Sequence, residues 1–121
     1  MLSELKNVRQ VEGEPFRRWF HDEFFDLIVW FGDADEILEF QLCYDLSGYE
    51  RALTWKKDSG FLHEQVDQGE DRPGQAKATP ILVKDGIFNR NEIAERFKDD
   101  SLEIDSTISE FIYDRLMEFP V

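Results

Sequence analysis

Residues 24–66 form short apolar runs separated by turn residues, and this pattern limits the chain to an antiparallel sheet. The runs are FFDLIVWF, EILEFQLCY, YERALTWK and FLHEQV, and the segments GDAD, DLSG and KDSG separate them. Aromatic and β-branched residues favour strands, whereas clusters of Gly, Asp and Ser favour turns. Because parallel strands need far longer connections than these, neighbouring runs must pair antiparallel. The sequence therefore predicts a β-meander.

The residues around the meander extend the sheet and then interrupt it. The predicted segments are a sheet over about 5–66, with strands at 5–11 and 16–21 before the meander, a loop at 67–79 and a short hairpin at 80–88. The loop is polar and contains Gly and Pro, and Asp85-Gly86 between apolar residues is typical of a tight hairpin turn.

The last third of the chain has the period of amphipathic helices, predicted over about 90–119. Asn89, with Glu92 three residues later, is typical of a helix N-cap, and Ser106 is the predicted cap of a second helix that Pro120 ends. At 121 residues the chain fits one domain. We therefore predict a single α+β domain over 1–121, with four to six antiparallel strands and two C-terminal helices packed on one face.

Alternation assigns the side chains of the strands to two faces. Four-residue loops would pair Phe31 with Glu36, Tyr44 with Tyr49, and Thr54 with His63. The predicted core side carries Phe25, Leu27, Val29, Leu38, Phe40, Leu42, Leu53 and Trp55. The opposite, mixed side carries Phe24, Asp26, Ile28, Trp30, Ile37, Glu39, Gln41, Cys43, Ala52 and Thr54.

The candidate catalytic residues are His63, Glu39 and Asp26, which the predicted register brings together on the mixed side. A carboxylate beside an imidazole raises the histidine pKa and orients the ring, as in general-base catalysis. A half-solvated sheet also alternates polar residues outward without any catalytic role. No Ser, Thr or Cys lies in a nucleophile motif such as G-x-S-x-G. An enzyme, small-molecule-binding or hydrolase-like, is therefore the alternative prediction rather than the first.

The first prediction is a binding or regulatory module that acts through protein contacts. The candidate contact residues are Trp30 and Phe24 on the mixed side, together with Gln41 and Thr54 on the same face. Aromatic residues exposed in one patch mark interfaces. The partner would be another protein or a second copy of the chain, unless the N-terminal segment covers this side.

The net charge of −13, from 27 acidic and 14 basic residues, narrows the class of partner. Phosphate binding depends on Lys and Arg, so nucleic acid and anionic membranes are not expected. In the last helix Glu110, Asp114 and Glu118 recur every fourth residue, a spacing that slightly destabilises a helix. This acidic face is a second candidate contact surface. The commoner explanation of these acidic residues is a solvated outer face of the helix. A weaker alternative function is that the chain mimics a nucleic acid.

No metal site and no cofactor are predicted. The two histidines, His21 and His63, have no paired spacing, and Cys43 is the single cysteine. GDADEILE lacks the Gly and third ligand of a calcium loop. The first residues, MLSELKNVRQVEGE, contain no secretory signal, so we expect a soluble protein of the cytoplasm.

The strings RRWFHDEFFDLIVWF, EFQLCYD, ERALTW and PILVKDGIF, in that order, are similar to a family of small bacterial proteins of unknown function. The resemblance covers most of the chain, from about Arg17 to the last helix. It implies a stand-alone bacterial cytoplasmic protein and brings no catalytic residue, ligand or partner with it.

Overall fold

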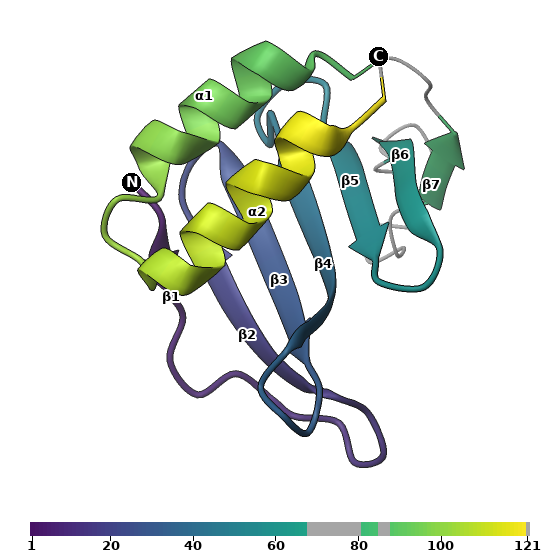
Figure 1. The fold of residues 1–121 in the computed structure, drawn as a ribbon. Coiled ribbons are helices and arrows are strands. Elements are labelled where there is room, and N and C mark those ends of the chain that lie inside the picture. The colour runs from purple at the N-terminus through teal and green to yellow at the C-terminus, as the bar shows by residue number, and fades with distance from the viewer. Residues whose placement is uncertain (68–80, 85–87, 121) are drawn as a thin grey trace, which may run out of the picture.

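The computed structural model describes residues 1–67, 81–84 and 88–120, which form one layer of strands and one layer of helices (Figure 1). The strands are β1 (Ser3–Glu4), β2 (Phe16–His21), β3 (Phe25–Phe31), β4 (Ile37–Tyr44), β5 (Arg51–Lys56), β6 (Gly60–Asp67) and β7 (Ile81–Lys84). In this part of the chain they form a seven-stranded sheet in sequence order, and every neighbouring pair is antiparallel. The predicted α+β class and β-meander are confirmed. The predicted loop at 67–79, apart from Asp67, and the turn at Asp85-Gly86 lie outside the described residues.

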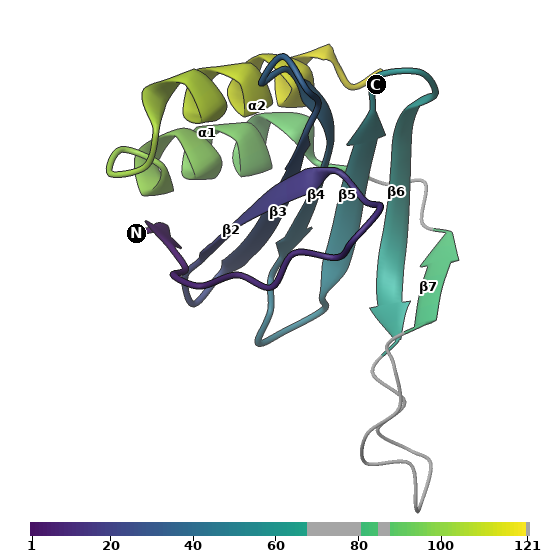
Figure 2. The ribbon, with the colours of Figure 1, turned by 90° about the horizontal axis from the view of Figure 1, so that it is seen from below.

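Two helices, α1 (Arg90–Asp100) and α2 (Ser106–Glu118), lie side by side on one face of the sheet (Figure 2). Asn89 caps α1 as predicted: its side-chain oxygen accepts a hydrogen bond from the Glu92 N–H, and its amide donates to the Glu92 carboxylate at 2.9 Å. The first bond satisfies a backbone donor that the first helical turn leaves unpaired, and the second joins the two side chains.

The cap of α2 is Asp105 rather than Ser106. The Asp105 carboxylate accepts from the Thr107 N–H at 2.9 Å, so Ser106 becomes the first helical residue. An aspartate at the N-cap also places negative charge at the positive end of the helix dipole. The helix ends at Glu118, and Phe119 is extended (φ −58°, ψ 127°), which is the conformation that the following Pro120 requires.

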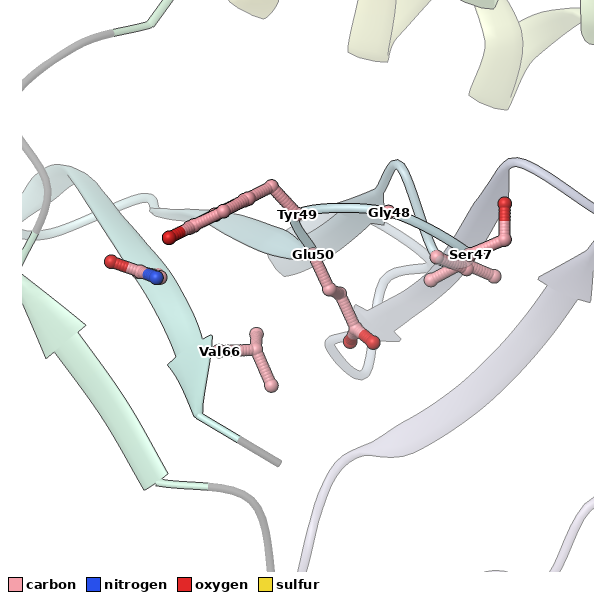
Figure 3. A pocket seen from close by; sticks show the side chains of 7 residues that line it. Ser47, Gly48, Tyr49, Glu50 and Val66 are labelled. Carbon is pink, nitrogen blue, oxygen red and sulfur yellow. The ribbon is translucent and has the colours of Figure 1, made fainter. Parts of the chain in front are cut away.

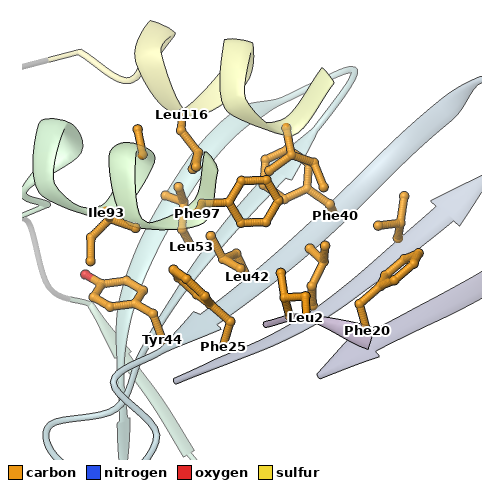
Figure 4. Close-up of a cluster of buried hydrophobic side chains, with 14 of the residues drawn as sticks. Leu2, Phe20, Phe25, Phe40, Leu42, Tyr44, Leu53, Ile93, Phe97 and Leu116 are labelled. Carbon is orange, nitrogen blue, oxygen red and sulfur yellow. The ribbon is translucent and has the colours of Figure 1, made fainter. Parts of the chain in front are cut away.

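The hydrophobic core lies between the helices and the sheet face that they cover (Figure 4). The predicted core position is confirmed for six strand residues that are fully buried: Phe25, Leu27, Val29, Phe40, Leu42 and Leu53. From the helices, Ile93, Phe97 and Leu116 fill the space above them. Because aromatic rings bury large areas, contacts such as the edge-on packing of Phe25 and Phe97 dominate this core.

The β3–β4 and β4–β5 connections are longer than the predicted four residues. Phe31 pairs with Ile37 rather than Glu36, and a β-bulge separates this pair from Trp30 and Glu39. The bulge turns Ile37 into the core, with 9% exposure, and removes Leu38 from the buried core, which corrects the prediction for both residues.

The β4–β5 loop is also longer, because Tyr44 pairs with Arg51 rather than Tyr49. Beyond the bulge, both shifts amount to two residues, and a strand's side chains return to the same face every second residue. Ile28 therefore lies opposite Gln41, and Gln41 opposite Thr54, on the predicted mixed side.

The β5–β6 hairpin differs from the prediction by one residue, which reverses the faces of β6. Lys56 pairs with Gly60, so the loop has three residues instead of four. Gly60 has a φ of +82°, the left-handed conformation that closes three-residue hairpins. His63 therefore lies opposite Leu53 and on the core side, and the predicted pair of Thr54 and His63 is wrong.

The N-terminal segment runs along the edge of β2 instead of forming the predicted strand at 5–11 (Figure 2). Its only strand residues are Ser3 and Glu4, which pair with His21 and Phe20. Further along, the Gln10 side chain both donates to and accepts from the backbone of Arg17, at 2.8 and 2.9 Å. The segment thus occupies the exposed backbone groups of an edge strand.

Candidate functional site

The sheet face that α1 and α2 leave uncovered is the candidate site, and we call it the open face (Figure 2). The strand registers place on its five central strands, β2 to β6, the side chains of Arg17, Trp19, His21, Asp26, Ile28, Trp30, Glu39, Gln41, Cys43, Ala52, Thr54, Lys56, Leu62 and Glu64. Its large apolar members are partly exposed, and Leu62 reaches 46%.

Two tryptophans flank an isoleucine on this face. Trp19 lies directly opposite Ile28, and Trp30 lies two residues along the same strand as Ile28. Trp30 forms the wall of an open groove of about 490 Å³, together with Leu38, Glu39 and Lys56 and residues of the neighbouring turns. This groove can receive a side chain of a partner, because it offers an aromatic surface beside charges of both signs.

Asp26 is held in a hydrogen-bond network with the strand next to it. Its Oδ1 accepts from the Trp19 indole N–H at 2.5 Å and lies 3.1 Å from His21 Nδ1. Its predicted partner was His63, but the structure pairs it with His21, directly opposite across the β2–β3 turn. From the sequence, residues 21–23 were not recognised as part of a turn. Recognising them as the start of a tight turn would have placed His21 beside Asp26.

The predicted contact residues Gln41 and Thr54 do meet on the open face. The Gln41 amide donates to the Thr54 hydroxyl at 3.4 Å, and Thr54 is only 6% exposed. Glu39 lies between Trp30 and Lys56 in the neighbouring row. These polar groups are thus held by cross-strand neighbours, as in ordinary sheets.

The predicted catalytic group is not assembled. His63 is on the other side of the sheet, 5% exposed, with its Nε2 at 2.6 Å from the Tyr44 hydroxyl and its ring stacked on the Tyr44 ring. It also packs against Phe88 and Phe119. Asp26 and Glu39 remain on the open face, so the sheet itself separates them from the imidazole. The three-residue hairpin at Gly60 is the reason for this correction.

Phe24 is also placed differently from the prediction. It precedes β3, and its ring packs against Phe25 and Tyr44 on the helix side of the sheet. The Arg96 guanidinium of α1 lies 3.6 Å from the centre of its ring. Phe24 therefore fixes α1 to the sheet and contributes nothing to the open face.

The open face offers no activated nucleophile at Cys43. Burial, together with the negative charges of Glu50 and Asp26, raises the pKa of the Cys43 thiol to about 12. The thiol is therefore protonated at neutral pH and unreactive. Among the described residues, no three His, Cys, Asp or Glu side chains are placed to hold a metal ion.

Two further surfaces lie outside the open face. Glu110, Asp114 and Glu118 are exposed along α2, as predicted, and Glu118 accepts from Arg115 at 2.6 Å. A hollow of about 430 Å³ lies at the β4–β5 loop, where Ser47, Tyr49, Glu50 and Val66 surround it (Figure 3). The sequence did not predict this hollow, because the loop was expected to have four residues and Tyr44 pairs with Arg51 instead of Tyr49.

Within the described residues, no helix is both long enough and apolar enough to cross a bilayer. No protein-family model, no curated protein and no solved structure matches the chain.

Proposed function

We propose that the chain is a binding module whose open face makes contact with another protein molecule, of a different kind or of its own. The observation that supports this most directly is the pair of partly exposed tryptophans on a sheet face that the helices leave uncovered. A solvated sheet face needs only polar side chains. Tryptophan is enriched at the energetic centres of interfaces, because its ring gives a large contact area at small entropic cost.

The arrangement of the polar groups supports binding rather than catalysis. Asp26 is engaged by Trp19 and His21, Gln41 is engaged by Thr54, and the Cys43 thiol is protonated at neutral pH. The alternative hydrolase required His63 as its base, and that residue lies in the core. Polar side chains that hydrogen bonds fix around an apolar centre favour a preformed contact surface, and such a surface lowers the entropic cost of binding.

The experiment is site-specific photocrosslinking in the organism that makes the protein. A benzophenone-bearing residue at position 62 reports on the open face, because Leu62 is 46% exposed there. The matched control carries it at position 102, since Leu102 is 74% exposed in the connection between the helices. We expect a discrete protein adduct from position 62 alone. Equal labelling from both positions would overturn the proposal.

A further inference from the structure

We infer that the partner on the open face is a second copy of this chain, packed sheet against sheet about a twofold axis that runs along β4. The inference rests on the proposed function and names its partner. β4 is the middle strand of the five that form the open face, so the axis places β2 over the β6 of the second copy and β3 over its β5.

The open face carries far less net charge than the chain as a whole. The whole chain carries −13, but the open face has three carboxylates, Asp26, Glu39 and Glu64, against Arg17 and Lys56 and the imidazole of His21. The excess negative charge therefore lies on other surfaces. A basic partner would be attracted to those surfaces and not to this one, whereas a nearly balanced face can meet its own copy.

The side chains of the open face also match those of a second copy in position. The cross-strand registers place Trp19 and Leu62 in one row of the open face, at its two sides. Rotation about β4 therefore puts the Trp19 ring over Leu62 of the second copy. Each such contact occurs twice in a twofold dimer, so two apolar pairs form.

The charged rows match in the same way. His21 and Glu64 lie at the two sides of the next row, so the rotation brings an imidazole to a carboxylate. Trp30 and Lys56 lie on β3 and β5 of the third row, so it brings an ammonium group to an indole ring. Aligned sheets pack at about −30°, which preserves these pairs best near the axis.

One residue opposes the dimer, and replacing it distinguishes the dimer from binding to a different partner. Glu39 is on β4 itself and therefore meets Glu39 of the second copy near the axis. Like charges that face each other across an interface weaken it. Replacing this carboxylate by its neutral isostere should tighten the dimer, whereas a polar contact to a different partner would be lost.

The open face offers a limited contact area to a second copy. Five strands about 4.8 Å apart, each with about seven residues of about 3.4 Å, give a face on the order of 600 Å². A standard interface buries about 800 Å² on each partner. Because interfaces smaller than the standard size belong mostly to transient complexes, we expect a weak dimer that dissociates on dilution.

The test is sedimentation of the purified chain over a wide concentration range, at low and at high NaCl. Two copies that each carry −13 repel one another at long range, so salt should strengthen association, whereas it would weaken binding to a basic partner. L62D should weaken the dimer about tenfold or more, and E39Q should tighten it several-fold. L102D is the control on the other side of the molecule and should leave association unchanged, with circular dichroism confirming the fold of each variant.

A monomer at every concentration and salt, or association that L62D leaves unchanged, would overturn the inference. The photocrosslink at position 62 separates this result from failure of the proposed function. An adduct with a different protein means that the open face binds a partner other than its own copy. Sedimentation as a monomer, together with no adduct beyond that of position 102, means that both proposals are wrong.

Discussion

Asp22 is a single buried carboxylate on which the geometry of the open face depends. It is 6% exposed, and its Oδ1 accepts from the backbone N–H groups of Phe24 and Phe25, at 2.8 and 2.7 Å. These bonds close the turn between β2 and β3, and that turn sets His21 opposite Asp26.

We expect D22A to lower the free energy of unfolding by about 1–3 kcal/mol, because the buried N–H of Phe25 and the half-buried N–H of Phe24 would lose their acceptor. D22N keeps an oxygen at the same place and should cost less. Urea denaturation measures both, with D33A in the exposed β3–β4 turn as the control. A D22A protein as stable as D33A would contradict this account of the turn.

Cys43 gives a prediction about pH and reactivity. Its pKa rises from 9.0 to about 12 in the folded chain, so at pH 8 the native state holds roughly a thousandfold less thiolate than the unfolded state. Ellman's reagent should therefore label the native protein far more slowly than the protein in urea. Because the raised pKa favours the neutral thiol, its contribution to stability is complete below pH 9 and is lost as the pH rises towards 12. Equal labelling rates would contradict the shift.

At the scale of elements, the length of the hairpin between β5 and β6 determines which side chains of β6 lie on each face of the sheet. Gly60 has a φ of +82°, and a Cβ built there meets no atom within 4 Å. We expect G60A to cost about 1 kcal/mol through backbone strain alone, and G60N to cost less, since asparagine tolerates this conformation better. Chemical denaturation measures the cost, and an unchanged midpoint for G60A would contradict it.

Most of the sheet could be predicted, because an error of two residues in the strand pairing leaves every side chain on the same face. Leu27, Phe40 and Leu53 were assigned to the core correctly even though the paired partners were shifted. His63 was not, because a hairpin shorter by one residue reverses every side chain of the next strand. Ile37 and Leu38 were reversed for a similar reason, since one extra residue forms a bulge.

The candidate site was predictable only in part. Trp30, Gln41 and Thr54 were placed on the correct face by their alternation, and the acidic positions of α2 by their spacing. The pairing of Asp26 with His21 was not, because it depends on the conformation of a turn whose residues also suit a strand. Turn geometry is set by a few φ angles, and residue type restricts those angles only loosely.

At the scale of the molecule, the net charge of −13 on 121 residues opposes compactness in every state of association. Screening by salt should weaken this repulsion more in the compact state, where the charges are closer together. We therefore expect the melting temperature, measured by circular dichroism at low protein concentration, to rise between about 20 and 300 mM NaCl. A melting temperature that falls over this range would mean that attractive ion pairs outweigh the repulsion.

The order of elements along the chain has a consequence for its synthesis. The strands β1 to β7 precede α1 and α2, so a ribosome releases the meander before the helices that cover Phe25 and Phe40 exist. Until residues 90–118 emerge, the nascent chain exposes this hydrophobic surface to the cell. Leu2, which precedes β1 and is also buried in the core, donates its N–H to the carbonyl of Asp100 at 2.7 Å, so this bond forms only after the end of α1 has been synthesised. Molecular chaperones that hold apolar segments are thus expected to engage this chain late, and to leave it only when its last helix docks.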